Sequence, residues 1–140
     1  MNEQENNRLE RGRALMRRLS PHLGDAMTND LNSVAPDFGD LLAGFAFADV
    51  WARPALPLRE RALVRIAALT ALGAPATATG ANIDSALQAG LSLEDVSEAM
   101  LQTLPYAGFP HVIAALEHVK QYAEAPAGPT ASEGPDSGGG

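Results

Sequence analysis

The acidic side chain of Asp49 stands on a helix face that is otherwise apolar. It follows Phe38, Leu42 and Phe45 at helical spacing, and it lies near the expected end of that helix. Apolar surroundings and the negative end of the helix dipole both disfavour a carboxylate, so we expect a raised pKa for Asp49. A carboxyl group of this kind is a candidate proton carrier. The alternative is a carboxylate paired with an arginine or exposed at the helix end.

Two arginines, Arg61 and Arg65, lie four residues apart and therefore on one side of a largely apolar helix. The planar fork of a guanidinium binds a carboxylate through two parallel hydrogen bonds, so this pair suits an anionic substrate. The alternative is that these arginines pair with carboxylates across a subunit interface.

Tyr106 and His111 are further candidates for passing a proton. Tyr106 follows Pro105, which ends a helix, and its hydroxyl would face a cavity or, alternatively, belong to a packed aromatic side chain. His111 and His118 are seven residues apart, whereas metal-binding pairs usually stand three or four apart on a helix. We therefore predict no metal site.

The apolar residues recur at helical spacing, and no alternating strand pattern is present. Turn and capping residues, such as Gly90 and the hydroxyl of Ser92, separate the segments. The helix 58–72 is expected to be buried on most sides. The sequence thus predicts an all-α fold of about six helices, at 3–19, 38–51, 58–72, 76–89, 92–104 and 110–124, with a helical turn near 25–31.

Length and composition bound the class of protein. A chain of 140 residues, 46% of them hydrophobic, is expected to form one domain, here residues 1–124. Residues 125–140 are rich in Pro, Gly and Ser, and we expect them to be disordered. The absence of cysteine excludes disulfides, thiolate metal sites and cysteine nucleophiles.

Charge and hydropathy favour a cytoplasmic protein. The net charge of −7 repels phosphate backbones, so nucleic acid is not an expected partner. The first residues are too polar for a signal peptide, and no apolar run is long enough to span a membrane. We expect no membrane partner.

Three segments together resemble the carboxymuconolactone decarboxylase family. They are FAFADVWARP at 45–54, LRERAL at 58–63, and the run from ALQAGL at 86–91 to YAGFP at 106–110. The resemblance implies an alkylhydroperoxidase-like fold with an antiparallel helix-pair core. It also implies a homo-oligomer, a trimer or hexamer, and a reaction that needs no metal or organic cofactor.

The sequence departs from the family pattern at two positions. Asn82 stands where a histidine is usual, and an amide cannot exchange a proton near neutral pH. Asp49 stands where glutamate is usual. A related branch uses a Cys-x-x-Cys pair, which this chain lacks, so we do not expect a thiol peroxidase.

The resemblance implies a cofactor-independent lyase that acts on a small, oxygenated cyclic metabolite, a lactone or ketone, by decarboxylation or proton transfer. In such a reaction Arg61 would hold the carboxylate or stabilise the oxyanion, and Asn82 would donate to the carbonyl. The proton would pass through Asp49, Tyr106 or His111. Substrate binding is assigned to Trp51, Arg65, Phe45 and Phe109. The alternatives are a cyclase, isomerase or dehydratase on the same scaffold, and a non-catalytic oligomeric or ligand-binding protein.

Overall fold

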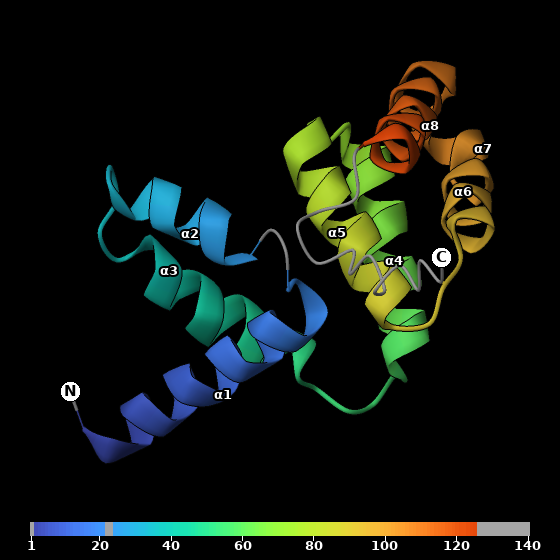
Figure 1. Cartoon of the computed structure of the whole chain (residues 1–140). Helices are drawn as coiled ribbons and strands as arrows, with labels where there is room; N and C mark the ends of the chain where they lie inside the picture. The colour runs from blue at the N-terminus through green and yellow to red at the C-terminus, as the bar shows by residue number, and fades with distance from the viewer. Residues whose placement is uncertain (1, 22–23, 126–140) are drawn as a thin grey trace, which may run out of the picture.

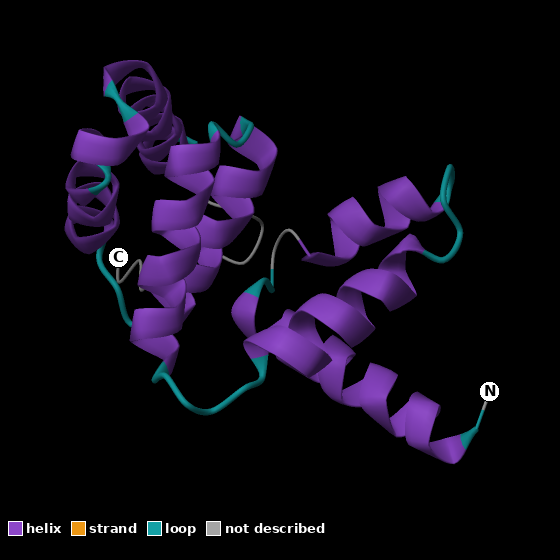
Figure 2. Cartoon of the chain, turned by 180° about the vertical axis from the view of Figure 1, so that it is seen from behind, coloured by secondary structure: helices purple, strands orange, loops and turns teal. Residues whose placement is uncertain are grey.

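Residues 2–21 and 24–125 are described in a computed structural model, and in this part of the chain every regular element is a helix. Figures 1 and 2, which view the chain from opposite sides, show two groups of helices joined by the linker 52–57. The first group contains α1 (Glu3–Leu19), α2 (Gly24–Asn32), α3 (Phe38–Leu41) and the π-helix η1 (Leu42–Trp51). The second contains α4 (Leu58–Leu72), α5 (Ala76–Gln88), α6 (Leu93–Gln102), α7 (Leu104–Ala107) and α8 (Phe109–Glu124).

The helices observed in the described residues confirm the predicted all-α class. Local sequence signals determine most of the helix ends. Ser92 and Asp95 form a reciprocal capping box at the start of α6, with Asp95 N–H donating to Ser92 Oγ at 3.0 Å. Gly73 and Gly90, which follow α4 and α5, adopt positive φ angles of 67° and 93°. The structure differs from the predicted six helices in three places. Helix α2 lies where only a helical turn was expected, the helix predicted at 38–51 is divided into α3 and η1, and α7 occupies a segment expected to be a turn.

The helix predicted at 38–51 changes its winding after Leu41. Beyond that residue the backbone bonds run from residue i+5 to residue i, as in the 2.9 Å bond from Ala52 N–H to the Phe47 carbonyl. The wider winding brings Leu42, Phe47 and Trp51, at intervals of five and four residues, to the same cavity. A 3.6-residue period does not predict this set.

Helix α1 crosses η1 with almost no space between the two backbones. Gly12 is buried at the crossing, and a Cβ atom added there would overlap the main-chain carbonyl of Ala43. Met16, Leu19 and Phe47 form the apolar core of this group. The close approach of α1 to η1 therefore depends on the missing side chain at position 12.

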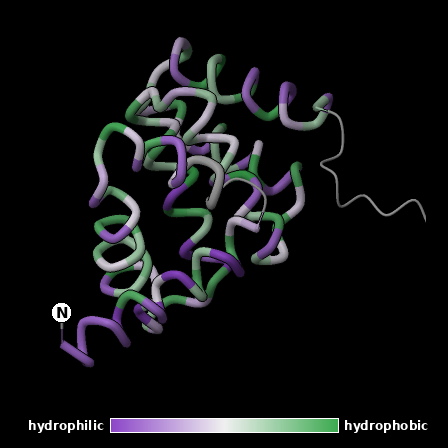
Figure 3. The backbone as a smooth tube through the Cα atoms, turned by 60° about the vertical axis from the view of Figure 1, so that its left-hand side comes forward, coloured by the Kyte–Doolittle hydropathy of each residue, from purple (hydrophilic) through white to green (hydrophobic). Residues whose placement is uncertain are grey.

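The main core of the second group lies between α4, α5, α6 and α8. Its most buried side chains include Ile66, Ile83 and Met100. The prediction that residues 58–72 are buried on most sides is wrong for this chain, because Val64 and Leu72 are 58% and 78% exposed. Figure 3 shows hydrophilic and hydrophobic residues alternating along the helices, as expected for helices that bury one side.

Part of the predicted tail lies outside the described residues, which end at 125. The division of the chain at residue 124 therefore stays a prediction. Within the described ranges, no helix combines the length and the apolar character needed to cross a membrane.

Candidate active site

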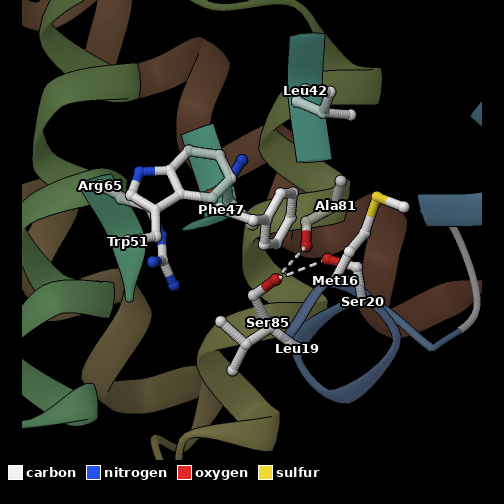
Figure 4. A pocket seen from close by; sticks show the side chains of 10 residues that line it. Met16, Leu19, Ser20, Leu42, Phe47, Trp51, Arg65, Ala81 and Ser85 are labelled. Carbon is white, nitrogen blue, oxygen red and sulfur yellow. Dashed lines mark hydrogen bonds between the residues drawn. The ribbon is translucent and has the colours of Figure 1, made fainter. Parts of the chain in front are cut away.

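A small pocket lies where the two groups of helices meet (Figure 4). Its cavity volume is about 50 Å³, enough for a few water molecules. Helices α1, η1, α4 and α5 all contribute to its walls. The lining residues are Met16, Leu19, Ser20, Leu42, Phe47, Trp51, Arg65, Ala81, Asn82 and Ser85.

The guanidinium of Arg65 is the charged group of this lining. Its Nη1 atom is buried and has no hydrogen-bond partner, and among the described residues no carboxylate lies within 4.0 Å of it. Burial, and then the nearby charge of Arg61, lower the pKa of Arg65. Arginine nevertheless keeps its proton in proteins, so the pocket contains a positive charge that an anionic ligand would neutralise.

Two aromatic side chains from η1 form the wall beside Arg65. The guanidinium carbon lies 5.2 Å from the centroid of the Trp51 ring, within range of a cation–π interaction. Phe47 meets Trp51 edge to face, with ring centroids 4.5 Å apart. The arrangement keeps one face of the guanidinium out of water.

The opposite side of the pocket carries neutral polar groups. Ser20 and Ser85 share a 2.8 Å hydrogen bond between their hydroxyls, and the Ser85 hydroxyl also donates to the Ala81 carbonyl at 3.2 Å. Asn82 donates one amide hydrogen to the Ala78 carbonyl at 2.9 Å, so its second hydrogen and its oxygen remain for a ligand. The pocket thus combines one cation, an apolar wall and hydrogen-bonding groups.

Among the residues that the structure describes, those lining the pocket include no carboxyl, imidazole or phenol group. It can therefore bind and polarise an anion, but its own side chains offer no ready proton carrier at neutral pH. Across the described residues, no group of three or more His, Cys, Asp or Glu side chains is arranged to hold a metal ion.

Comparison with known proteins places the chain in a family. A sequence model of the carboxymuconolactone decarboxylase family matches residues 36–121. The chain is also 32% identical over 100 residues to the 4-carboxymuconolactone decarboxylase of Acinetobacter baylyi, an alignment that covers 71% of this chain and 73% of that protein. The chain belongs to the carboxymuconolactone decarboxylase family. The matched span includes η1, α4 and α5, which carry most of the pocket lining.

Three of the site residues predicted from the sequence meet in the pocket of this family member. Trp51, Arg65 and Asn82 all line it. Sequence reasoning missed Phe47, Ser20 and Ser85. Serine at two helix positions carries no signal of its own, because only the packing of α1 against α5 brings the two hydroxyls together.

Asp49 lies outside the pocket, and the prediction of a raised pKa is wrong. Arg8 donates to both carboxylate oxygens, with Nε–Oδ1 at 2.8 Å and Nη2–Oδ2 at 2.6 Å. These hydrogen bonds lower the pKa of Asp49 below its ordinary value. The π-helical winding turns position 49 away from the face of Leu42 and Phe47, and the alternative of an arginine-paired carboxylate describes what the structure shows.

Arg61 also differs from its predicted role, because it binds main-chain carbonyls. It donates Nε–H to the carbonyl of Leu56, and Nη1–H to the carbonyl of Trp51 at 2.8 Å. These main-chain bonds occupy donors that were predicted to hold a substrate carboxylate or an oxyanion.

The remaining predicted site residues lie on other surfaces. His111 contacts the Ala71 carbonyl through Nδ1 at 3.0 Å, at the end of α4. Tyr106 is 93% exposed and Phe109 68% exposed, both near the start of α8. Phe45, 65% exposed, lines a separate surface hollow with Arg8. The structure does not bring these four side chains close to Arg65. A helical period predicts which residues share one face of a helix, but it does not predict which other helix packs against that face.

We expect the substitution Asp49→Asn to leave anion binding and turnover unchanged and to alter the pH dependence of stability. Because the folded-state pKa of Asp49 is lowered, the Arg8 pair stabilises the fold above the ordinary aspartate range and loses that effect as the pH falls below about 4. Thermal melts of both proteins at pH 6 and pH 3 measure this. The melting temperature of the wild type should exceed that of the variant at pH 6, and this difference should shrink at pH 3. A large loss of turnover in Asp49→Asn would show that the carboxyl group takes part in a reaction.

Proposed function

We propose that this family member is a cofactor-independent enzyme that acts on a small, oxygenated cyclic carboxylate by decarboxylation or a related proton transfer. The observation that carries the proposal is the guanidinium of Arg65, which lines the pocket with a buried N–H that no protein acceptor satisfies. A partly buried cation with no carboxylate partner is costly in the free protein, and an anionic ligand reduces that cost. The A. baylyi relative is named for a carboxylated lactone, which belongs to this chemical class.

The chemistry of such a substrate fits the groups in the pocket. In decarboxylation the bond between the ring carbon and the carboxylate breaks, and its electron pair moves into a conjugated carbonyl as carbon dioxide leaves. Negative charge then gathers on the carbonyl oxygen. A guanidinium fixed beside that oxygen, with the free amide hydrogen of Asn82, stabilises the charge where it develops.

The proton that completes the reaction is assigned to water. The described lining residues include no acid, and Asp49, Tyr106 and His111 lie elsewhere. A water molecule close to the serine hydroxyls would be oriented by Ser20 and Ser85. The protein's part is then to position the substrate and to stabilise charge.

The pocket must widen to admit a ring. Its volume of about 50 Å³ is well below the roughly 300 Å³ at which small-molecule sites begin. Its walls come from two groups of helices joined by the linker 52–57, whose residues are all exposed. Separation of the groups along the Ser20–Ser85 contact enlarges the pocket without unfolding either core.

A second candidate function is a non-catalytic ligand-binding protein. Among the described residues the lining includes no carboxyl, imidazole or phenol group, which favours this function, since binding an anion needs only Arg65 and the neutral polar groups opposite it. Turnover distinguishes the two functions, because a binding protein would bind carboxylated lactones and return them unchanged.

The experiment that tests the proposed enzyme compares the wild type with Asn82→His on carboxylated unsaturated lactones. Nuclear magnetic resonance of substrate and product, with release of carbon dioxide, is the readout. An imidazole in the pocket adds a proton carrier, so decarboxylation should rise about 10²-fold over a measurable wild-type rate. Binding without turnover in either protein would contradict the enzyme and favour the binding protein.

We also propose a homo-oligomer, a trimer or hexamer, with an interface over α7 and the start of α8. Leu72, Tyr106, Phe109 and Ile113 are large apolar side chains that are more than half exposed. They lie on helices that pack together, since α7 contacts both α4 and α8. A second copy of the chain would remove this apolar surface from water.

Adding charge to this surface should dissociate the oligomer. The double variant Tyr106→Asp with Phe109→Asp places two unpaired carboxylates in the interface, and each is costly to bury. Light scattering coupled to size-exclusion chromatography should show the wild type as an oligomer and this variant as a monomer. Val34→Asp, at an 81% exposed position in the first group, is the control that should keep the wild-type mass. A monomeric wild type at micromolar concentration would contradict the proposal.

A further inference from the structure

Arg61 joins the two groups of helices at the edge of the pocket. It lies one helical turn before Arg65 on α4, in the second group, yet both of its hydrogen bonds go to earlier residues outside α4. One goes to Leu56 within the linker. The other, 2.8 Å long, goes to the carbonyl of Trp51, the last residue of η1.

The Trp51 carbonyl is one of the acceptors left open at a helix end. A cation there satisfies the carbonyl and interacts favourably with the negative end of the helix dipole. The end of η1 is also held by the packing of Trp51 against the apolar core of the first group, whereas residues 52–57 are all exposed and so are not held by burial. Arg61 adds a direct side-chain attachment between the end of η1 and the start of α4.

The indole of Trp51 transmits this attachment to the pocket. It is half-buried between the Phe47 ring, 4.5 Å away, and the guanidinium of Arg65, 5.2 Å away. Holding the main chain of Trp51 holds the indole, and the indole limits the directions in which Arg65 can point. The positive charge of Arg61 also adds to the attraction of the site for anions.

We propose that Arg61 is a positioning residue, which fixes Trp51 through its main-chain carbonyl and so keeps the Arg65 guanidinium pre-arranged for an anion. The inference rests on the proposed function only in taking Arg65 as the anion-binding group. It replaces the direct contact with substrate expected from the sequence by an indirect action. Pre-arrangement lowers the entropic cost of binding, so loss of Arg61 should weaken anion binding without removing the binding group.

Trp51 gives a direct readout, because the sequence contains a single tryptophan. The full-length protein is titrated with acetate, a carboxylate small enough for the closed pocket, against sodium chloride at equal ionic strength. Tryptophan emission reports binding, and quenching by the neutral molecule acrylamide reports the exposure of the indole. The variants are Arg61→Met, Arg61→Lys and, as matched control, Arg59→Met. Arg59 lies on the same helix and also donates to a main-chain carbonyl, that of Gly90 at 2.6 Å, away from the pocket.

Arg61→Met should raise acrylamide quenching and weaken acetate binding about tenfold, the equivalent of one lost charge-assisted hydrogen bond. Arg59→Met should match the wild type in both measurements. Arg61→Lys, which keeps a donor but not the fork, should fall between them, and it carries the test if circular dichroism shows that Arg61→Met does not fold. Wild-type quenching and binding in folded Arg61 variants would overturn the inference. The proposed function fails separately, since there Arg65→Met would bind acetate as well as the wild type does.

Discussion

Replacing Arg65 by methionine is expected to lower kcat/KM by about two to three orders of magnitude while leaving the melting temperature unchanged or higher. The loss of activity follows from removing the cation that meets the substrate's negative charge in a small, largely apolar pocket. The unchanged or higher stability follows from removing a partly buried charge that no protein carboxylate offsets. Methionine fills similar space beside Trp51.

Lower activity combined with an unchanged or higher melting temperature distinguishes an anion-binding site from a structural ion pair. Removing one partner of a buried ion pair lowers stability and activity together. Removing an arginine that binds only the ligand lowers activity alone. Arg53→Met, at an exposed position in the linker, is the matched control and should leave both quantities unchanged. A fall of several degrees in melting temperature for Arg65→Met, with activity retained, would show that Arg65 serves the fold.

Gly12→Ala is expected to reduce the free energy of unfolding by about 3 kcal/mol or more. The new methyl group would overlap the Ala43 carbonyl, and main-chain atoms held within two helices cannot move aside as a side chain can. Helix α1 must then shift from η1, which disturbs the packing of Met16 and Leu19 against Phe47. Urea unfolding followed by Trp51 emission measures the loss.

Gly80→Ala is the control for a glycine without such a contact. A Cβ atom at position 80, inside α5, would meet no atom within 4 Å. Alanine restricts the unfolded chain and suits a helix, so this variant should gain about 0.5–1 kcal/mol. Equal stability of the two alanine variants would show that α1 and η1 do not approach as closely as described.

Local sequence signals predicted the helices well where one residue decides the end of an element. Ser92 at the start of α6 and Gly90 after α5 act through their own side-chain and backbone chemistry, whatever the rest of the chain does. The π-helix η1 was not predicted, because an apolar run such as 42–51 is compatible with more than one winding. Its winding decides that Phe47, rather than Phe45, lines the pocket.

The candidate site was predicted only in part, because the sequence does not show which residues contact one another. The sequence identified Arg65 as a cation on an apolar helix, but it did not distinguish Arg65 from Arg61, which binds main-chain carbonyls. It could not show that Arg8, 41 residues away, neutralises Asp49. Contacts between residues distant in sequence depend on how the helices pack, and a helical period carries no information about them.

Helix α1 forms part of the pocket wall but lies outside the span that the family model matches. Met16, Leu19 and Ser20 close one side of the pocket, yet the family match begins only at residue 36. Divergence of relatives in residues 1–35 would therefore reshape one wall while Arg65, Trp51 and Asn82 stay in place on the shared helices. One wall of the pocket thus comes from outside the span that the family model matches, and exchanging α1 between relatives would test whether that wall alters what the pocket binds.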